Sequence, residues 1–277
     1  MSEKFNLNWQ LEHRKLGEST PLLMGLAEVE LNITELCNRT CSFCPRHDPK
    51  IYPNLNLNMS IATVNRIKDQ LIENKFKGSI ILSGFGESVL NKDIYKIVSI
   101  LSDFSVEVIT NGDTILNGKT SITQLFDSGL TTLTLNNYDN NHQLEKIAAS
   151  NKQIRLRNNY DDGGNHYEEY GFNNRGGVLW KDNTSVNRPC YVSEYRIVFD
   201  WNGEVLLCTH NWNKDIKFGN INKRALVDIW YDSEFLKYRK ALYSGDRTIS
   251  ESCKNCNIKG NLIGGEYADI WINSFKA

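Results

Sequence analysis

Short apolar runs alternate with amphipathic segments over roughly the first 160 residues. A run of β-branched and apolar residues indicates a strand, and apolar residues at three- and four-residue intervals indicate a helix. This pattern predicts strands over 27–34, 79–83, 106–110, 131–136 and 154–157, with a sixth around 175–180. It predicts helices over 60–74, 92–101, 121–128 and 142–150. Alternating strands and helices are typical of a parallel sheet built from βαβ units, so the fold class is α/β.

The pattern changes after about residue 160. The stretch up to Pro189 is rich in Asn and Gly, which predicts a linker or a substrate loop. Residues 195–200 and 204–208 are expected to form a hairpin around Trp201-Asn202-Gly203, and a helix is expected over 225–243. We therefore expect three parts, an N-terminal extension (1–25), a core (26–188) and a small C-terminal unit (189–277).

Charge and hydropathy exclude several classes of protein. The 277 residues include 32 basic and 33 acidic ones, for a net charge of −1, so no basic patch for nucleic acid is implied. No apolar run approaches the roughly 18 residues of a membrane span. The polar N-terminus lacks the apolar core of a signal peptide. We expect a cytoplasmic protein without a nucleic-acid or membrane partner.

The seven cysteines carry the strongest chemical signal. Their odd number and their ligand-like spacing argue against a disulfide framework. Three follow the first predicted strand in a C-x3-C-x2-C pattern, and four lie in the C-terminal unit: Cys37, Cys41 and Cys44; Cys190, Cys208, Cys253 and Cys256. Three thiolates suit an iron–sulfur cluster with one open iron, and four can close a tetrahedral or cubane site. By spacing alone, zinc remains an alternative for both sets.

Two motifs resemble those of the radical S-adenosylmethionine (SAM) enzymes. The C-x3-C-x2-C loop, with Phe43 before its third cysteine, resembles the cluster loop of that family. The order Cys190, 17 residues, Cys208, a helix and then Cys253-x2-Cys256 resembles the twitch domain, a short form of the SPASM domain. The resemblance implies a partial (β/α)6 radical SAM barrel followed by a small α+β twitch domain with a β-hairpin and a helix. It also implies two 4Fe–4S clusters, ligated by the two cysteine sets, and SAM.

The resemblance extends to the ends of the following strands. Gly84-Phe85-Gly86-Glu87 resembles the family segment whose backbone and carboxylate receive the methionine ammonium of SAM, and glycines permit a close backbone approach there. It implies cofactor contacts for Gly84, Gly86 and Glu87, and for Asn111 and Asn136 near the ribose. Each segment can also be read as an ordinary turn.

The number of cysteines favours one type of reaction within the family. Three plus four ligands use every cysteine, so none is left to donate a hydrogen atom as many radical epimerases require. A fully ligated second cluster is suited to accepting an electron. The resemblance therefore implies that a 5′-deoxyadenosyl radical removes hydrogen from a secondary alcohol of a small polar, sugar-like or cyclitol substrate, giving a ketone. An external one-electron reductant of the flavodoxin or ferredoxin type is also implied.

Two residues are candidates for handling the substrate. Arg175 is a fixed cation with a forked set of donors, suited to orienting hydroxyls or stabilising an alkoxide. His210, two residues after Cys208, is expected to face the gap between the clusters and to accept the proton at an ordinary pKa near 6.5, or else to support the cluster.

Two other functions remain open at this point. One is a peptide-modifying radical SAM enzyme, a thioether former or epimerase, although residues 1–25 are too short for the leader-binding domain such enzymes usually carry. The other is a zinc-stabilised binding module without catalytic activity. Iron and sulfide analysis separates this last alternative from the enzyme readings.

Overall fold

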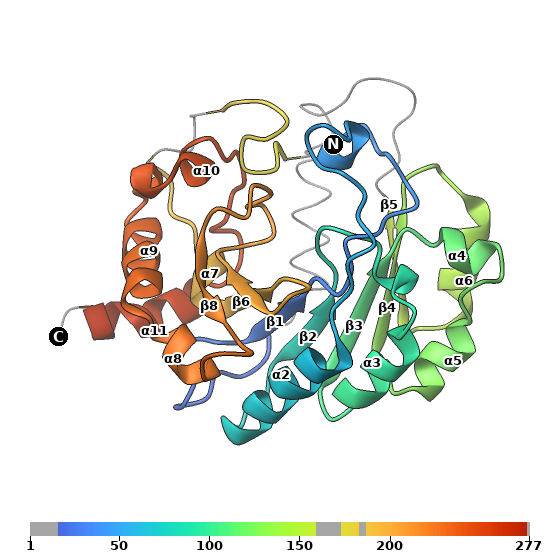
Figure 1. Ribbon diagram of the computed structural model, residues 1–277, viewed down its shortest axis with the longest axis horizontal. Helices are drawn as coiled ribbons and strands as arrows, with labels where there is room; N and C mark the ends of the chain where they lie inside the picture. The colour runs from blue at the N-terminus through green and yellow to red at the C-terminus, as the bar shows by residue number, and fades with distance from the viewer. Residues whose placement is uncertain (1–15, 159–172, 183–186, 276–277) are drawn as a thin grey trace.

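A single eight-stranded sheet runs through the molecule in the order β5-β4-β3-β2-β1-β6-β7-β8 (Figure 1). This computed structural model describes residues 16–158, 173–182 and 187–275. The strands are β1 (Glu28–Leu31), β2 (Ser79–Leu82), β3 (Ser105–Thr110), β4 (Thr132–Asn137), β5 (Ile154–Asn158), β6 (Arg196–Phe199), β7 (Glu204–Leu206) and β8 (Lys217–Asn220). The five N-terminal strands confirm those predicted from the apolar pattern.

The sixth parallel strand is not where the sequence pattern placed it. It is β6, which pairs in parallel with β1 from Glu28↔Arg196 to Leu31↔Phe199. Residues 175–180 form turns instead, because Arg175, Gly176 and Gly177 all adopt left-handed backbone angles (φ 53°, 65° and 83°) that no strand accommodates. β6 then turns back into the predicted hairpin with β7, and β8 adds a further antiparallel strand that was not predicted.

The four helices predicted for the N-terminal half are confirmed, and the short helix α4 (Asp113–Leu116) is an additional one that was not predicted. The four are α2 (Ile61–Glu73), α3 (Ile94–Leu101), α5 (Ile122–Asp127) and α6 (His142–Ser150), with single turns η1 (Pro45–His47) and η2 (Ser88–Leu90). Ser60 caps α2 by accepting a hydrogen bond from the Thr63 N–H at 3.1 Å. Ile72 of this helix is 50% exposed. Figure 1 shows α2, α3 and α5 along one side of the sheet.

The C-terminal half is more broken than its pattern suggested. The predicted helix over 225–243 is two helices, α8 (Leu226–Trp230) and α9 (Ser233–Tyr243), because Asp232 caps α9 by accepting from the Glu234 N–H. The remaining elements are α7 (Val192–Tyr195), η3 (Arg247–Ile249), α10 (Glu251–Lys254) and α11 (Gly265–Phe275). The last helix was not predicted, and its Trp271 is buried against Trp230.

The central strand β1 is buried on both sides. Val29 and Leu31 join the main hydrophobic core, while the alternate residues Glu28 and Glu30 are buried carboxylates. Arg196, the β6 partner of Glu28, pairs with both of them, with its NH1 group 3.0 Å from Glu30 Oε2. Buried charges need such partners, so this cross-strand cluster fixes β6 beside β1.

The described part of the N-terminal extension packs against both halves. The Gly17 N–H donates to the Ala27 carbonyl, and its carbonyl accepts from the Tyr267 hydroxyl of α11 at 2.6 Å. Residues 1–15 lie outside the described ranges. The expected boundary at 188–189 precedes α7, and the sheet continues across it through β1 and β6. Within the described residues, no helix has the length and apolar character to cross a membrane.

Candidate active site

The first cysteine set forms a loop directly after β1. All three thiols are free, and they lie close enough that their charges affect one another. Burial raises the pKa of Cys41 to about 12, and Cys44 and Cys37 add to this effect. Thiolates gathered in this way need a strong positive charge, which an iron–sulfur cluster supplies. The donor set therefore fits a cluster.

Polar side chains from two neighbouring strand ends hold this loop. The Arg39 Nε donates to Asp113 Oδ2 after β3 at 2.7 Å, and its NH2 group lies 2.6 Å from Asp139 after β4. The Asn54 side chain pairs reciprocally with the backbone N–H and C=O of Cys37, both at 2.9 Å. The loop is thus fixed at the carboxyl edge of the parallel strands, where ligands bind in α/β folds.

Glycines of the segment after β2 allow it to lie directly on the first cysteine loop. A Cβ at Gly86 would stand 2.1 Å from the Thr34 carbonyl oxygen and 2.7 Å from that of Leu36. Gly84 adopts φ 134°, and a Cβ there would stand 2.9 Å from the Cβ and Oδ1 of Asn32. Both glycines are explained by this packing; a direct contact with SAM remains a prediction.

Glu87 presents a buried carboxylate with one uncommitted oxygen. Its Oε2 accepts from the Asn111 N–H at 2.8 Å, whereas Oε1 has no hydrogen-bond partner among the described residues. Burial raises the pKa of Glu87 to about 7, although the polar groups of Thr110, Asn111 and Val89 oppose the rise. An unpaired buried carboxylate oxygen fits a cationic ligand such as the methionine ammonium of SAM.

The two asparagines expected near the ribose are engaged within the protein. The Asn111 amide donates to Asn38 Oδ1 of the cysteine loop at 2.9 Å, and its Oδ1 accepts from the Asp113 N–H. Asn136 Oδ1 accepts from Arg157 Nε at 2.6 Å. Both lie at the predicted strand ends, and their contacts tie neighbouring strands together; cofactor contacts for them remain predictions.

The second cysteine set surrounds one cavity, which Cys190, Cys208, Cys253 and Cys256 all line together with Ser193, His210 and Arg247. Burial raises the pKa of Cys253 to about 12 and that of Cys256 to about 11, and the charges of neighbouring cysteines add to the rise. Gly260 allows its backbone to reach Cys190, since a Cβ there would lie 2.2 Å from the Cys190 Sγ. The four cysteines thus fit a fully ligated cluster.

The turn at 174–177 connects the two cysteine sets. Asn174 is fully buried, and its Nδ2 donates to the Asn255 and Trp180 carbonyls. Its Oδ1 accepts from the Asn257 N–H at 3.3 Å. Arg175 then reaches in the opposite direction, and its Nε donates to the Phe43 carbonyl between two cysteines of the first set at 3.3 Å. Arg175 therefore lies between the two sites, as its proposed role requires.

His210 lies against the second set, and its pKa departs from the expected one. Burial and the positive charges of Arg175, Arg196 and Arg247 lower its pKa to about 3, instead of the ordinary value expected from the sequence. An anionic cluster would act in the opposite direction. Its Nδ1 is buried without a hydrogen-bond partner among the described residues. The ring is therefore available as a hydrogen-bonding group facing the cavity.

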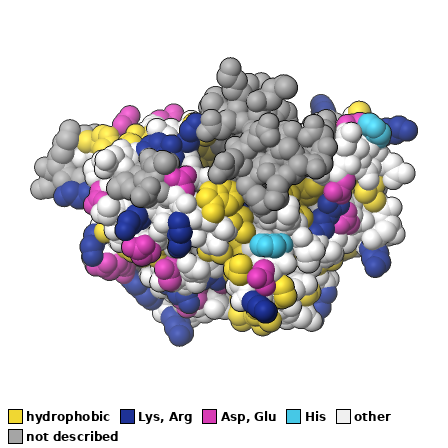
Figure 2. All heavy atoms as spheres, turned by 90° about the horizontal axis from the view of Figure 1, so that it is seen from above, with side chains coloured by type: hydrophobic (Ala, Val, Ile, Leu, Met, Phe, Trp, Pro, Cys, Tyr) yellow, Lys and Arg dark blue, Asp and Glu magenta, His cyan; other side chains and the backbone are white. Residues whose placement is uncertain are grey.

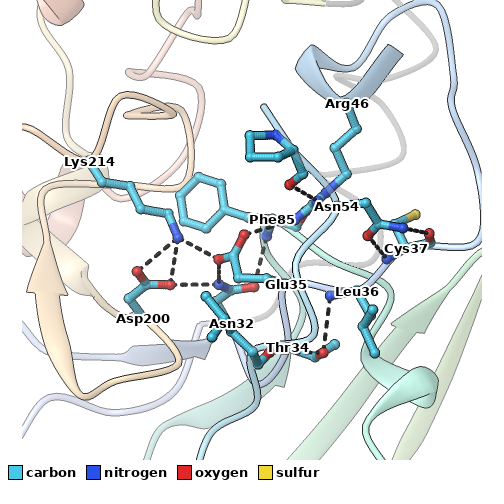
Figure 3. Close-up of polar contacts among 12 residues, drawn as sticks. Asn32, Thr34, Glu35, Leu36, Cys37, Arg46, Asn54, Phe85, Asp200 and Lys214 are labelled. Carbon is cyan, nitrogen blue, oxygen red and sulfur yellow. Dashed lines mark hydrogen bonds and ion pairs between the residues drawn. The ribbon is translucent and has the colours of Figure 1, made fainter. Parts of the chain in front are cut away.

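A buried charged cluster beside the first loop was not predicted (Figure 3). We call it the Lys214 cluster; it comprises Asn32, Glu35, Arg46, Asp200 and Lys214. Burial by itself would raise the pKa of Glu35, but Lys214 and Arg46 outweigh it and hold this pKa below its ordinary value. The sequence feature that could have indicated this cluster is the presence of charged residues directly after buried strands.

Basic and acidic side chains are interspersed on the surface seen from above, as their nearly equal numbers suggest (Figure 2). Among the described His, Cys, Asp and Glu side chains, no group of three is arranged to hold a single metal ion. The case for clusters therefore rests on the cysteine sets and on similarity to known proteins.

Comparison with known proteins defines the class of this chain. Residues 190–257 match the SPASM family, described as an iron–sulfur cluster-binding domain. The crystal structure of BtrN in complex with AdoMet and 2-DOIA superposes with a TM-score of 0.71 and 26% identity, covering 84% of this chain and 93% of BtrN. The C-terminal part of the chain therefore carries a SPASM-type iron–sulfur cluster-binding domain, and the chain as a whole is similar to BtrN, which binds AdoMet in that structure.

A curated relative indicates the kind of enzyme. The S-adenosyl-L-methionine-dependent 2-deoxy-scyllo-inosamine dehydrogenase of Niallia circulans is 28% identical over 248 residues, which cover 85% of this chain and 93% of the relative. A second BtrN structure, in an open conformation, is 22% identical with a TM-score of 0.64 and supports the fold. This similarity to a named dehydrogenase is the basis of the function proposed below.

Proposed function

We propose that the protein is a SAM-dependent dehydrogenase that oxidises a secondary alcohol of a small cyclitol or sugar-like substrate to a ketone. The observation that carries the proposal is the arrangement of four cysteines around one cavity, linked to the first set through Arg175. Such a site has no open iron for a substrate, which suits it to receiving an electron. The named dehydrogenase relative acts on 2-deoxy-scyllo-inosamine, a substrate of this chemical class.

The cofactors and the protein divide the reaction between them. Cys37, Cys41 and Cys44 would hold the first cluster, which together with SAM would supply the chemistry for removing one hydrogen atom, and the four C-terminal cysteines would hold a second cluster able to accept one electron. The hydroxyl proton must also leave, which balances the loss of two hydrogens from the alcohol. We assign Arg175 to hold the substrate oxygen, since its guanidinium is a fixed cation between the two sites. The unpaired Nδ1 of His210 supplies a second hydrogen-bonding group beside it.

The surrounding roles complete the proposal. Glu87 would bind the ammonium of SAM, with Gly84, Gly86, Asn111 and Asn136 forming the walls of the cofactor site. An external flavodoxin or ferredoxin would reduce the first cluster, and the cytoplasm would protect both clusters from oxygen. We retain 26–188 and 189–277 as functional units that share one sheet.

Two measurements on anaerobically purified protein test this function. Iron and sulfide analysis should give about eight iron atoms per chain, as two cubanes require. With SAM, a reductant and a panel of aminocyclitols and inositols, the product should be two hydrogens lighter than its substrate, with one 5′-deoxyadenosine per ketone. Zinc retained without iron, or a product isomeric with its substrate, would reject the proposal.

A further inference from the structure

The Lys214 cluster joins parts of the chain that carry different cysteine sets. Asn32 and Glu35 follow β1 and precede Cys37, whereas Asp200 follows β6. Lys214 belongs to the connection between β7 and β8, which also contains Cys208. Figure 3 shows the Lys214 side chain pointing at Asp200 and Glu35 from one side, with Arg46 on the other. Both cysteine loops therefore end in the same buried cluster.

Lys214 bridges two buried carboxylates. Its Nζ lies 2.5 Å from Glu35 Oε1 and 2.8 Å from Asp200 Oδ2, and the two carboxylate side chains are only 3% and 6% exposed. The Asn32 amide also donates to both, at 2.8 and 2.6 Å. Arg46 lies 2.8 Å from the other oxygen of Glu35. Two cations thus balance two anions, and removal of Lys214 would leave the two carboxylates with one excess negative charge in a buried site.

The loop around Lys214 is held firmly at this point. Lys214 adopts a left-handed backbone angle, φ 50°, which a non-glycine residue keeps only when its surroundings enforce it. Its ammonium also lies 4.4 Å from the centre of the Phe85 ring. Two residues earlier, Trp212 packs edge-on against Phe85 and Tyr52, with centroid distances of 5.0 and 4.7 Å. The loop from Cys208 to Ile216 is therefore anchored on the core.

We propose that Lys214 is a positioning residue that holds the 208–216 loop, and with it Cys208, against the end of β1 that leads to Cys37. The inference rests on the proposed function, in which an electron passes from the substrate to the second cluster. It adds that the relative placement of the two cysteine sets depends on charge balance in the Lys214 cluster. When that balance is lost, SAM cleavage continues but fewer cleavage events yield ketone.

A pair of variants of the cluster-loaded enzyme tests this role. Lys214→Met removes the cation, and Asp200→Asn/Lys214→Met removes one anion as well, so that Arg46 and Glu35 remain as a balanced pair. We expect Lys214→Met to speed amide hydrogen exchange over 209–216 by at least about tenfold. Exchange in α2 should stay unchanged, and ketone formed per 5′-deoxyadenosine should fall several-fold. The double variant should restore both quantities to within about twofold of the wild type.

Each result decides the question. The proposal would be overturned if Lys214→Met changed neither the amide hydrogen exchange over 209–216 nor the ketone formed per 5′-deoxyadenosine. It would also be overturned if the double variant failed to fold or still formed less ketone per 5′-deoxyadenosine than the wild type. If Lys214→Met alone does not fold, the proposal is still supported by a double variant that folds and forms as much ketone per 5′-deoxyadenosine as the wild type. Failure of the proposed function is a separate outcome: the wild type would form no ketone, while hydrogen exchange would still report on the loop.

Discussion

At the scale of single residues, Glu87 shows how surroundings prepare a side chain for a ligand. It is 5% exposed, one oxygen is bound by the Asn111 N–H, and the other has no partner among the described residues. Burial raises its pKa to about 7, so the group changes charge within the range in which enzymes are assayed. A bound ammonium needs the ionised form, which links cofactor affinity to pH.

We therefore predict that SAM affinity falls as the pH falls through 7. A carboxyl with a pKa of about 7 is roughly nine-tenths ionised at pH 8 and one-tenth at pH 6, so affinity should drop about tenfold between them. Glu87→Gln should bind SAM weakly at both values. Calorimetric titration of cluster-loaded protein with SAM measures this affinity at each pH. The control is Glu107→Gln, which removes another buried carboxylate of the same sheet and should leave the pH dependence of SAM affinity unchanged. A flat profile in the wild type would contradict it.

At the scale of elements, asparagine side chains organise the two cysteine loops. Asn54 holds the backbone of Cys37, and Asn174 holds the carbonyl of Asn255 and the N–H of Asn257. An amide side chain donates and accepts at once, so it can replace a strand partner for a loop that has none. Cys37 and Cys256 therefore keep a defined place although neither belongs to a helix or a strand.

Replacement of Asn174 should release the C-terminal cysteine pair. Asn174→Ala removes its hydrogen bonds to the backbone of residues 180, 255 and 257, including the buried one to the Asn255 carbonyl, which should cost about 2–4 kcal/mol of unfolding free energy. Iron content should fall from about eight to about four per chain as the second cluster is lost. Thermal melts and iron analysis measure both, and Asn65→Ala on the exposed face of α2 is the control. Full iron content with an unchanged melting temperature would show that this turn is dispensable.

The sequence predicted those features that repeat locally. Strand and helix periods located β1 to β5 and the hairpin, and spacing located both cysteine sets. What it did not reveal depends on pairing across the fold: Lys214 and Glu35 are 179 positions apart, and no local period records that they meet. For the same reason the sixth parallel strand was placed in the turn at 175–180, since strand propensity does not say which neighbour β1 will select. The break before Ser233 depended on a single Asp cap.

At the scale of the whole molecule, the two functional units share a sheet. β6 lies between β1 and β7, and Arg196 of β6 pairs with the buried carboxylates of Glu28 and Glu30. Residues 26–188 consequently need the C-terminal unit to complete the buried interior around β1.

A fragment ending at residue 188 should therefore fail to fold. It would lack Arg196, which leaves two buried carboxylates of β1 without their cation, at a cost of roughly 3–5 kcal/mol, and it would expose the edge of β1. Size-exclusion chromatography should show aggregates. The matched control is the full chain with Cys253→Ser and Cys256→Ser, which keeps the sheet and should retain about four iron atoms. A monomeric fragment with a cooperative melt would show that the core is independent.

The position of β6 also affects how the chain is made in the cell. Asn32 and Asp200, which meet at the ends of β1 and β6, are separated by 168 positions, so most of the chain must leave the ribosome before that flank of β1 is covered. Until then the first cysteine loop stands on an incomplete scaffold. Iron delivery to this protein is thus expected to follow the end of translation, and slow codons before residue 196 would prolong the interval in which the nascent chain can aggregate.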